Sequence, residues 1–235
     1  MEINQFYING NFVDPIGQEK IDLINPATEE RVGHVVTGLE QDVDAAVSAA
    51  KSAFNEASLL TLEQKKVILQ EIIDGMQARK EEFAQVISEE MGAPIKVARS
   101  AQFGSGLVHF INTLKVIDDF SFTEVHDNIT INKLPIGPVG MITPWNWPLN
   151  QMCTKVASAI AAGTTFVLKP SEITPGAAHL FAEVVHETSM PKGMFNLIHG
   201  HGAVVGKAMS KHADLEMISF TGSTRAGIDI QKTAA

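Results

Sequence analysis

The sequence contains a single cysteine, Cys153, which excludes an internal disulfide framework and suits a reducing compartment. Clusters of basic residues are also lacking, and the net charge is −9. Both features disfavour a surface for nucleic acid or anionic membranes, because phosphate binding requires clustered Lys and Arg. The amino terminus lacks the layout of a signal peptide, and the longest weakly polar stretch, 156–168, is too short to span a bilayer. We therefore expect a cytoplasmic protein that binds neither nucleic acid nor membrane.

Several short segments predict β-hairpins. With 235 residues, 45% of them hydrophobic, the chain is long enough to bury a sizeable core in one large or two small domains. Asn9-Gly10 separates two β-prone runs, and this dipeptide tolerates the positive φ of a type I′ turn. A second extended pair spans 21–36. In 125–135, apolar and polar residues alternate as in a half-exposed hairpin, whose edge is available to another subunit.

Helical periodicity governs the region between these hairpins. Apolar residues at helical spacing predict a first helix around 43–54. A capping box of Thr61 and Gln64 predicts the start of a second helix, which we expect to end at Gly92. A third helix is expected over 97–118. The apolar faces of these helices are those expected of core packing, and we assign these helices no catalytic or binding role.

From residue 138 onward, the pattern predicts a parallel sheet flanked by helices. Four short apolar runs lack alternation, as expected of strands covered on both faces; they span 138–143, 164–169, 194–200 and 216–222. The helices expected between them span 150–162, 174–188 and 203–211, the middle one with Thr174 as N-cap and Pro175 at the first helical position. The fold class is therefore α/β, and ligands of such sheets bind beyond the carboxyl ends of the strands.

Each of the four predicted strands delivers a distinctive group at its carboxyl end: TPWN, KPSE, GHGAVVG and FTGS, in chain order. Lys169 and Glu172 are suited to bracket a ribose, and the carboxylate would repel a 2′-phosphate, which favours NAD over NADP. A surface ion pair is the plainer explanation for these two residues. The convergence of four groups is a stronger signal than any one motif.

Two of these motifs are weak when taken alone. The run from Gly200 to Gly206 has three residues before its last glycine, where the dinucleotide fingerprint has two, so it also fits a plain glycine-rich turn. Gly222-Ser223 before a helix offers N–H groups and the positive end of the helix dipole to a pyrophosphate. It equally fits an ordinary serine N-cap.

The four motifs together resemble the aldehyde dehydrogenase superfamily, in its order and at its usual intervals. FYINGNFV and INPATEE also resemble its amino-terminal segment, so the resemblance covers essentially the whole chain. It implies a Rossmann-like NAD-binding domain with an N-terminal helical and β-hairpin part and a β-hairpin oligomerisation arm. The implied division is 1–120 for the N-terminal part of that domain, 121–137 for the arm and 138–235 for the dinucleotide-binding core.

The resemblance also assigns roles to individual residues. Asn146 matches the asparagine of the oxyanion hole, and a side-chain amide can donate to an oxygen that gains charge. Trp147, where the family usually has Phe, matches a lining position of the aldehyde tunnel, as do Gln151 and Thr154. The positions that match cofactor contacts are Ile142, Thr143, Pro144, Trp145, Lys169, Glu172, Gly202, Gly206, Phe220, Gly222 and Ser223.

The implied activity is oxidation of an aldehyde to an acid with NAD through a cysteine thioester, in a homo-oligomer. The family's catalytic cysteine and general-base glutamate follow FTGS at a distance beyond Ala235, so we expect this chain alone to be inactive. We interpret Cys153, which lies on a predicted helix, as a small core residue rather than a nucleophile. His199 and His201 are too few ligands for a metal. The alternative is a non-catalytic nucleotide-binding or interaction module.

Overall fold

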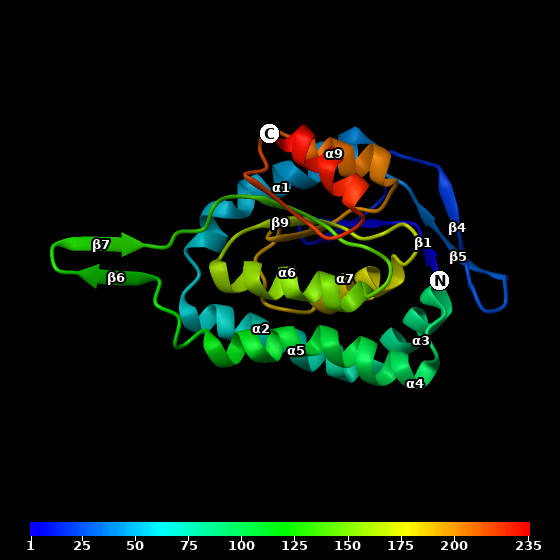
Figure 1. The fold of residues 1–235 in the computed structure, drawn as a ribbon, viewed down its shortest axis with the longest axis horizontal. Coiled ribbons are helices and arrows are strands. Elements are labelled where there is room, and N and C mark those ends of the chain that lie inside the picture. Colours follow the sequence, from blue (N-terminus) through cyan, green and yellow to red (C-terminus); the bar gives the residue numbers. More distant parts are fainter.

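The computed structural model describes residues 1–235, and a six-stranded sheet forms its centre (Figure 1). Its strand order is β11-β8-β9-β10-β2-β3, and the first four of these strands are parallel. The parallel strands are β8 (Val139–Ile142), β9 (Phe166–Lys169), β10 (Phe195–Leu197) and β11 (Met217–Phe220). The helices that follow them are α6 (Pro148–Ala162), α7 (Gly176–His186), α8 (Lys207–Lys211) and α9 (Thr224–Ala234). The predicted α/β fold class is confirmed.

Helices cover both faces of this sheet. In Figure 1, α6 and α7 lie on one side of the strands, and α1 (Glu40–Ser58) lies with α9 on the other. An outer layer of α2 (Leu62–Ala78), α3 (Lys80–Met91) and α5 (Phe103–Val116) packs against α6 and α7. Along β9 the side chains alternate between two cores: Phe166 and Leu168 belong to the larger one, and Val167 to the one beneath α1. The central strands therefore bury both faces, as their unbroken apolar runs predict.

The fourth parallel strand is an exception to this prediction. β11 lies at the edge of the sheet and pairs only with β8. Met217 is exposed, and the other three residues of the strand are half-buried. The expectation that this run is covered on both faces was wrong, because an apolar run indicates a strand without showing whether the strand has two neighbours.

The first predicted hairpin is confirmed, and it joins the central sheet. Asn9 and Gly10 both have positive φ, 52° and 74°, between β2 (Phe6–Ile8) and β3 (Asn11–Val13). β2 pairs antiparallel with β10. The second extended pair is β4 (Lys20–Ile24) and β5 (Arg31–Val36), which form a separate sheet with β1 (Glu2–Ile3).

The predicted helix ends are confirmed where the signal is local. Thr61 accepts the Gln64 backbone N–H, and the Gln64 side chain accepts the Thr61 N–H, which completes the capping box. Gly92 ends its helix in the left-handed conformation. The expected single helix from 61 to 92 is instead two, because Arg79 leaves helical geometry between α2 and α3. The third expected helix consists of α4 (Ile95–Val97), a π-helical turn η1 (Ala98–Gln102) and α5.

The predicted N-cap of α7 was wrong. The helix begins at Gly176, after Pro175, and no side chain of the preceding residues caps it. The hydroxyl of Thr174 instead donates to the Trp145 carbonyl at 3.4 Å. The Gly176 N–H donates to the buried carboxylate of Glu90 on α3, at 3.0 and 3.1 Å. A residue distant in sequence has taken the role that local sequence assigned to Thr174.

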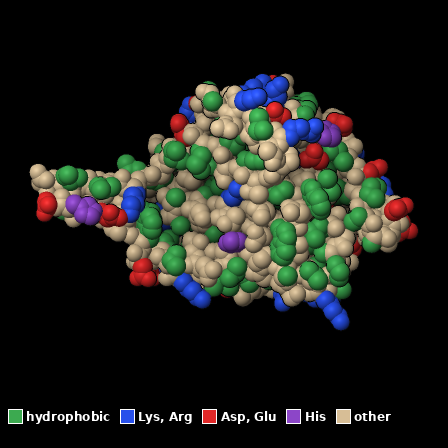
Figure 2. All heavy atoms as spheres, in the orientation of Figure 1, with side chains coloured by type: hydrophobic (Ala, Val, Ile, Leu, Met, Phe, Trp, Pro, Cys, Tyr) green, Lys and Arg blue, Asp and Glu red, His purple; other side chains and the backbone are tan.

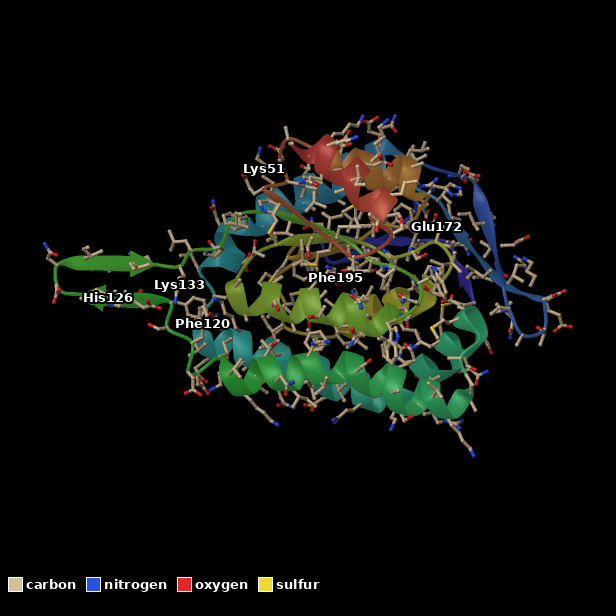
Figure 3. The ribbon with its side chains drawn as sticks, viewed as in Figure 1. Lys51, Phe120, His126, Lys133, Glu172 and Phe195 are labelled. Carbon is tan, nitrogen blue, oxygen red and sulfur yellow. The ribbon has the colours of Figure 1, made fainter.

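The strands β6 (Thr123–His126) and β7 (Ile129–Asn132) form the predicted hairpin, which makes up most of the segment 121–137 that we call the arm. It projects away from the body with hydrophobic, charged and histidine side chains along it (Figure 2). Its turn places Asp127 at a φ of 52°, and both isoleucines of β7 are exposed. At its base the Lys133 ammonium lies 4.8 Å from the centre of the Phe120 ring (Figure 3). None of the helices combines the length and apolarity that crossing a bilayer requires.

Candidate functional site

A cleft of about 1330 Å³ opens where β8, β9 and β11 end, and a turn before α8 and one face of α9 complete its walls. Such a position beyond the carboxyl ends of parallel strands is where ligands of α/β proteins bind. Thirteen of the fifteen residues that the sequence analysis selected line it: Ile142, Thr143, Pro144, Trp145, Asn146, Gln151, Lys169, Glu172, Gly202, Gly206, Phe220, Gly222 and Ser223.

Trp147 and Thr154 are the two selected residues that do not line the cleft. Trp147 is the half-buried residue that precedes α6, and Thr154 is half-buried one turn beyond Gln151 on that helix. Their expected place in an aldehyde tunnel stays a prediction. Helical spacing alone places Gln151 and Thr154 on one flank, but it does not fix how far along the helix the cleft extends.

Lys169 and Glu172 form a partly buried ion pair at the end of β9. The Lys169 Nζ donates to the Glu172 carboxylate at 3.1 Å and to the Pro170 carbonyl at 2.9 Å. Only 2% of the Lys169 side chain is exposed, against 31% for Glu172, so the surface pair considered from the sequence is not what forms. Burial lowers the pKa of Lys169 despite its partner. For Glu172, burial opposes ionisation, yet Lys169 and the Gly202 backbone N–H together lower its pKa. Figure 3 shows Glu172 near α9.

The glycine run forms a π-helical turn, η2 (Gly202–Gly206), which leads directly into α8. A π turn holds one more residue than an α turn, which accounts for the extra residue between the glycines. A side chain added at Gly206 would point toward Ile142 and Lys169, with their atoms 3.8 and 3.9 Å away, inside the cleft. Glycine at this position keeps the chain bare where a ligand can approach the backbone.

Ser223 is the N-cap of α9, and its hydroxyl accepts the Ala226 N–H at 3.3 Å. The serine is thus an ordinary cap and a cleft residue at once, since its own O–H is still able to donate. Three basic side chains that the sequence analysis missed also line the cleft: Lys207, Arg225 and Lys232. The motif at the end of β11 indicated roles for Gly222 and Ser223 only, although Arg225 follows two residues later in the first turn of α9.

Asn146 lies in an exposed turn whose backbone carbonyls accept hydrogen bonds from two buried side chains. Gln102 donates its side-chain N–H to the Asn146 carbonyl at 3.3 Å, and Thr174 donates to the neighbouring Trp145 carbonyl. Asn146 is exposed and lines the cleft, and 51% of Trp145 is exposed beside it. Sequence reasoning did not select Gln102, because no motif links it to this turn.

Three other candidates, Cys153, His199 and His201, do not line the cleft, although His201 lies beside it. Cys153 is fully buried in the larger core, and burial raises the pKa of its thiol. It is therefore a core residue, as expected. Burial likewise holds the pKa of His199 well below its usual value. His201 lies 4.0 Å from the Glu172 carboxylate and 3.5 Å from that of Glu19.

Comparison with known proteins then identifies the family. The sequence profile described as "Aldehyde dehydrogenase family" matches residues 12–235. The chain belongs to the aldehyde dehydrogenase family. The 3-succinoylsemialdehyde-pyridine dehydrogenase of a Pseudomonas species is 43% identical to it over 235 residues, which are 100% of this chain and 49% of that protein.

Solved aldehyde dehydrogenases have the same fold. One from Bartonella henselae superposes with a TM-score of 0.97 at 45% identity, covering 100% of this chain and 50% of that one. A variant of aldehyde dehydrogenase C from Pseudomonas syringae, in complex with NAD+ and octanal, gives 0.97 at 45% identity and covers 98% and 48%. The resemblance inferred from the four motifs is therefore confirmed. The chain spans about half the length of the relatives it matches.

Proposed function

We propose that the cleft binds NAD, with preference over NADP. Three features of the site fit a dinucleotide. The cleft is large and most of its lining residues are not hydrophobic, Gly206 lines it without a side chain, and the N-terminus of an eleven-residue helix opens into it at Ser223. That helix end, with Arg225 and Lys207 nearby, supplies donors and positive charge for a pyrophosphate.

The Lys169–Glu172 pair is the proposed site of the adenosine ribose. The Glu172 carboxylate is held ionised by Lys169 and by the Gly202 N–H, so it is able to accept hydrogen bonds from vicinal hydroxyls. A 2′-phosphate at the same position would meet a fixed negative charge, which is the physical basis for the preference. Gly202 and Gly206 line the cleft on this side, and Phe220 and Gly222 line it at β11.

The turn at 142–146 is the proposed end of the cleft that holds the nicotinamide ring. When NAD is bound, its nicotinamide would accept a hydride there. Asn146 would donate its side-chain amide N–H to the aldehyde oxygen as that oxygen gains charge. Gln151 lines the same end of the cleft, and Trp147 and Thr154, which do not line it, are proposed to line an aldehyde tunnel that leads to Asn146. The substrate class we propose is therefore an aldehyde.

Further proposals concern the wider assembly. The exposed apolar residues of the arm support a role in homo-oligomer formation, because an unpaired edge is able to add strands from another copy. We describe the arm as 121–137, between an N-terminal part at 1–120 and the dinucleotide-binding core at 138–235. A cytoplasmic location agrees with the single, unpaired and buried cysteine.

A second function is favoured by one observation. No cysteine lines the cleft, and the only thiol is buried on α6, so the nucleophile of the thioester reaction is not among these residues. The chain by itself would then be a nucleotide-binding module without turnover. This possibility concerns activity only and leaves the proposed NAD site unchanged.

The single observation that carries the proposal is the meeting of Asn146, Lys169, Glu172 and Ser223 in one cleft. Titration of the chain with NAD, NADP and ADP-ribose by calorimetry tests it. We expect NAD and ADP-ribose to bind and NADP to bind more weakly. Absence of binding to all three would refute the site. Incubation with NAD and a simple aldehyde is expected to yield no NADH, and steady turnover would overturn the assignment of Cys153 to the core.

A further inference from the structure

Gln102 is a buried polar residue that touches the turn of Asn146 from below. Only 2% of it is exposed, and its side-chain nitrogen donates to the Asn146 carbonyl at 3.3 Å and to the Met91 sulfur at 3.4 Å. Its side-chain oxygen is buried without a hydrogen-bond partner. A glutamine buried with half of its polar capacity unused is costly, so a neutral apolar residue would suit a purely structural position better.

The backbone around Gln102 has an unusual geometry that directs this side chain. Gln102 ends the π-helical turn η1, in which the Phe103 N–H reaches back five residues to the Ala98 carbonyl. The extra residue of such a turn rotates the preceding side chains by about 100° relative to the following α-helix. π turns are often found at functional sites for this reason.

Close packing of two helices brings Gln102 within reach of the turn. Gly106 lies one helical turn beyond Gln102, and a Cβ added there would stand 2.8 Å from the Cβ of Leu149 on α6. The absence of a side chain at Gly106 therefore lets α5 approach α6. Gln102 thus contacts Asn146, which precedes the N-cap of α6, and Gly106 packs against Leu149 in the first turn of that helix.

We propose that Gln102 is a positioning residue, which holds the backbone of Asn146 so that the side-chain amide of Asn146 is directed into the cleft. The inference rests on the proposed role of Asn146 as the donor to the developing oxyanion. Gln102 does not line the cleft, so it acts through Asn146 and not on a ligand. Besides the bond from Gln102, the turn of residues 143–146 is tied by the longer bond from Thr174 to the Trp145 carbonyl and, at its first residue, by the Thr143 N–H, which donates to the Lys169 carbonyl at 3.1 Å.

The test uses the two tryptophans of the chain, which flank Asn146 and therefore report on this turn alone. Gln102→Met preserves length and apolar bulk but removes the donor. Met91→Leu removes the other partner of the Gln102 nitrogen, and Ser105→Ala removes the hydroxyl that donates to the Gln102 backbone carbonyl. These two variants are the matched controls. The readouts are the two indole N–H resonances and the Asn146 side-chain amide resonance in NMR spectra of the whole chain, with far-UV circular dichroism to verify folding.

We expect Gln102→Met to shift both indole resonances and the Asn146 amide, whereas both controls leave them in place. The binding of NADH, measured by energy transfer from the indoles, is expected to weaken roughly fivefold relative to ADP-ribose, the size that one net hydrogen bond supplies. Unchanged resonances in a folded Gln102→Met variant would overturn the inference. Equal shifts in a control would also overturn it, because the effect would then be general packing.

Two further outcomes are informative. If neither ADP-ribose nor NADH binds the wild-type chain, the proposed function fails, while the indole resonances still decide whether Gln102 holds the turn. If Gln102→Met does not fold, hydrogen exchange of the wild-type protein decides instead. Slow exchange of the Gln102 side-chain amide protons would support the bond to Asn146, and exchange at the rate of free glutamine would contradict it.

Discussion

Glu90 offers the sharpest test of the electrostatics of this fold. Its carboxylate is 4% exposed and accepts the Gly176 N–H at the start of α7 with both oxygens. Burial raises the pKa of Glu90 from 4.5 to about 8, and the bond from Gly176 opposes this only in part. Glu90→Gln keeps an acceptor for the Gly176 N–H and removes the titration.

The sign of the effect follows from proton linkage. The folded pKa lies above the unfolded one, so the folded state binds more protons between them. The contribution of Glu90 to the free energy of unfolding is therefore fully present below about pH 4.5 and is lost as the pH rises through 8. Because one pKa unit corresponds to ~1.4 kcal/mol, the difference between 4.5 and about 8 sets an upper bound of about 5 kcal/mol. A loss of half that size would be a large part of the free energy of unfolding of a typical protein, which is ~5–15 kcal/mol.

Urea denaturation of wild type and Glu90→Gln at pH 5, 7 and 9 measures this effect. We expect the variant to gain stability relative to wild type as the pH rises, with the steepest change below pH 8. Glu89→Gln is the matched control, since Glu89 is the preceding residue, is less buried and receives its bond from Gln85. A difference between wild type and Glu90→Gln that stays constant with pH would refute the reasoning, as would an equal pH dependence in the control.

Three other predictions follow from the structure. Glu172→Gln is expected to lower the ratio of NADP to NAD dissociation constants roughly tenfold, because a repulsion of ~1.4 kcal/mol or more between the carboxylate and the 2′-phosphate disappears. Calorimetric titration measures this ratio, and an unchanged ratio would show that Glu172 does not contact the ribose. Thr61→Ala is expected to lower the free energy of unfolding by ~1 kcal/mol, because the capping box of α2 is lost. The melting temperature should then fall by ~2–4 °C, and an unchanged melting temperature would contradict this. Cys153 is expected to react with a thiol reagent only after unfolding, because it is fully buried; rapid reaction of the native chain would show that α6 opens.

Local signals were the part of the fold that could be predicted. The Thr61–Gln64 capping box, the left-handed Gly92 and the Asn9-Gly10 turn each depend on residues within four positions of one another. The cleft itself was predicted for a related reason. Successive parallel strands end at one edge of a sheet, so motifs at their ends must meet wherever the strands are correctly assigned.

Contacts between distant segments were beyond prediction. Local sequence predicts Thr174 as the N-cap of α7, but its hydroxyl donates to the Trp145 carbonyl, and Glu90 on α3 supplies the acceptor for the start of the helix. Gln102 reaches Asn146 across 44 positions through a π turn that has no sequence signature. Whether Trp147 and Thr154 line the cleft likewise depends on packing, and a motif at residues 143–146 does not determine it.

The pairing of Tyr7 with Leu197 has a consequence for synthesis on the ribosome. The β2–β3 hairpin is translated well before the strand on which it docks, because 190 residues separate Tyr7 from Leu197. At ~5–20 residues per second, this interval is roughly 10–40 s. During this interval β2 lacks the strand beside which it pairs in the central sheet, so a segment that is translated early joins that sheet late.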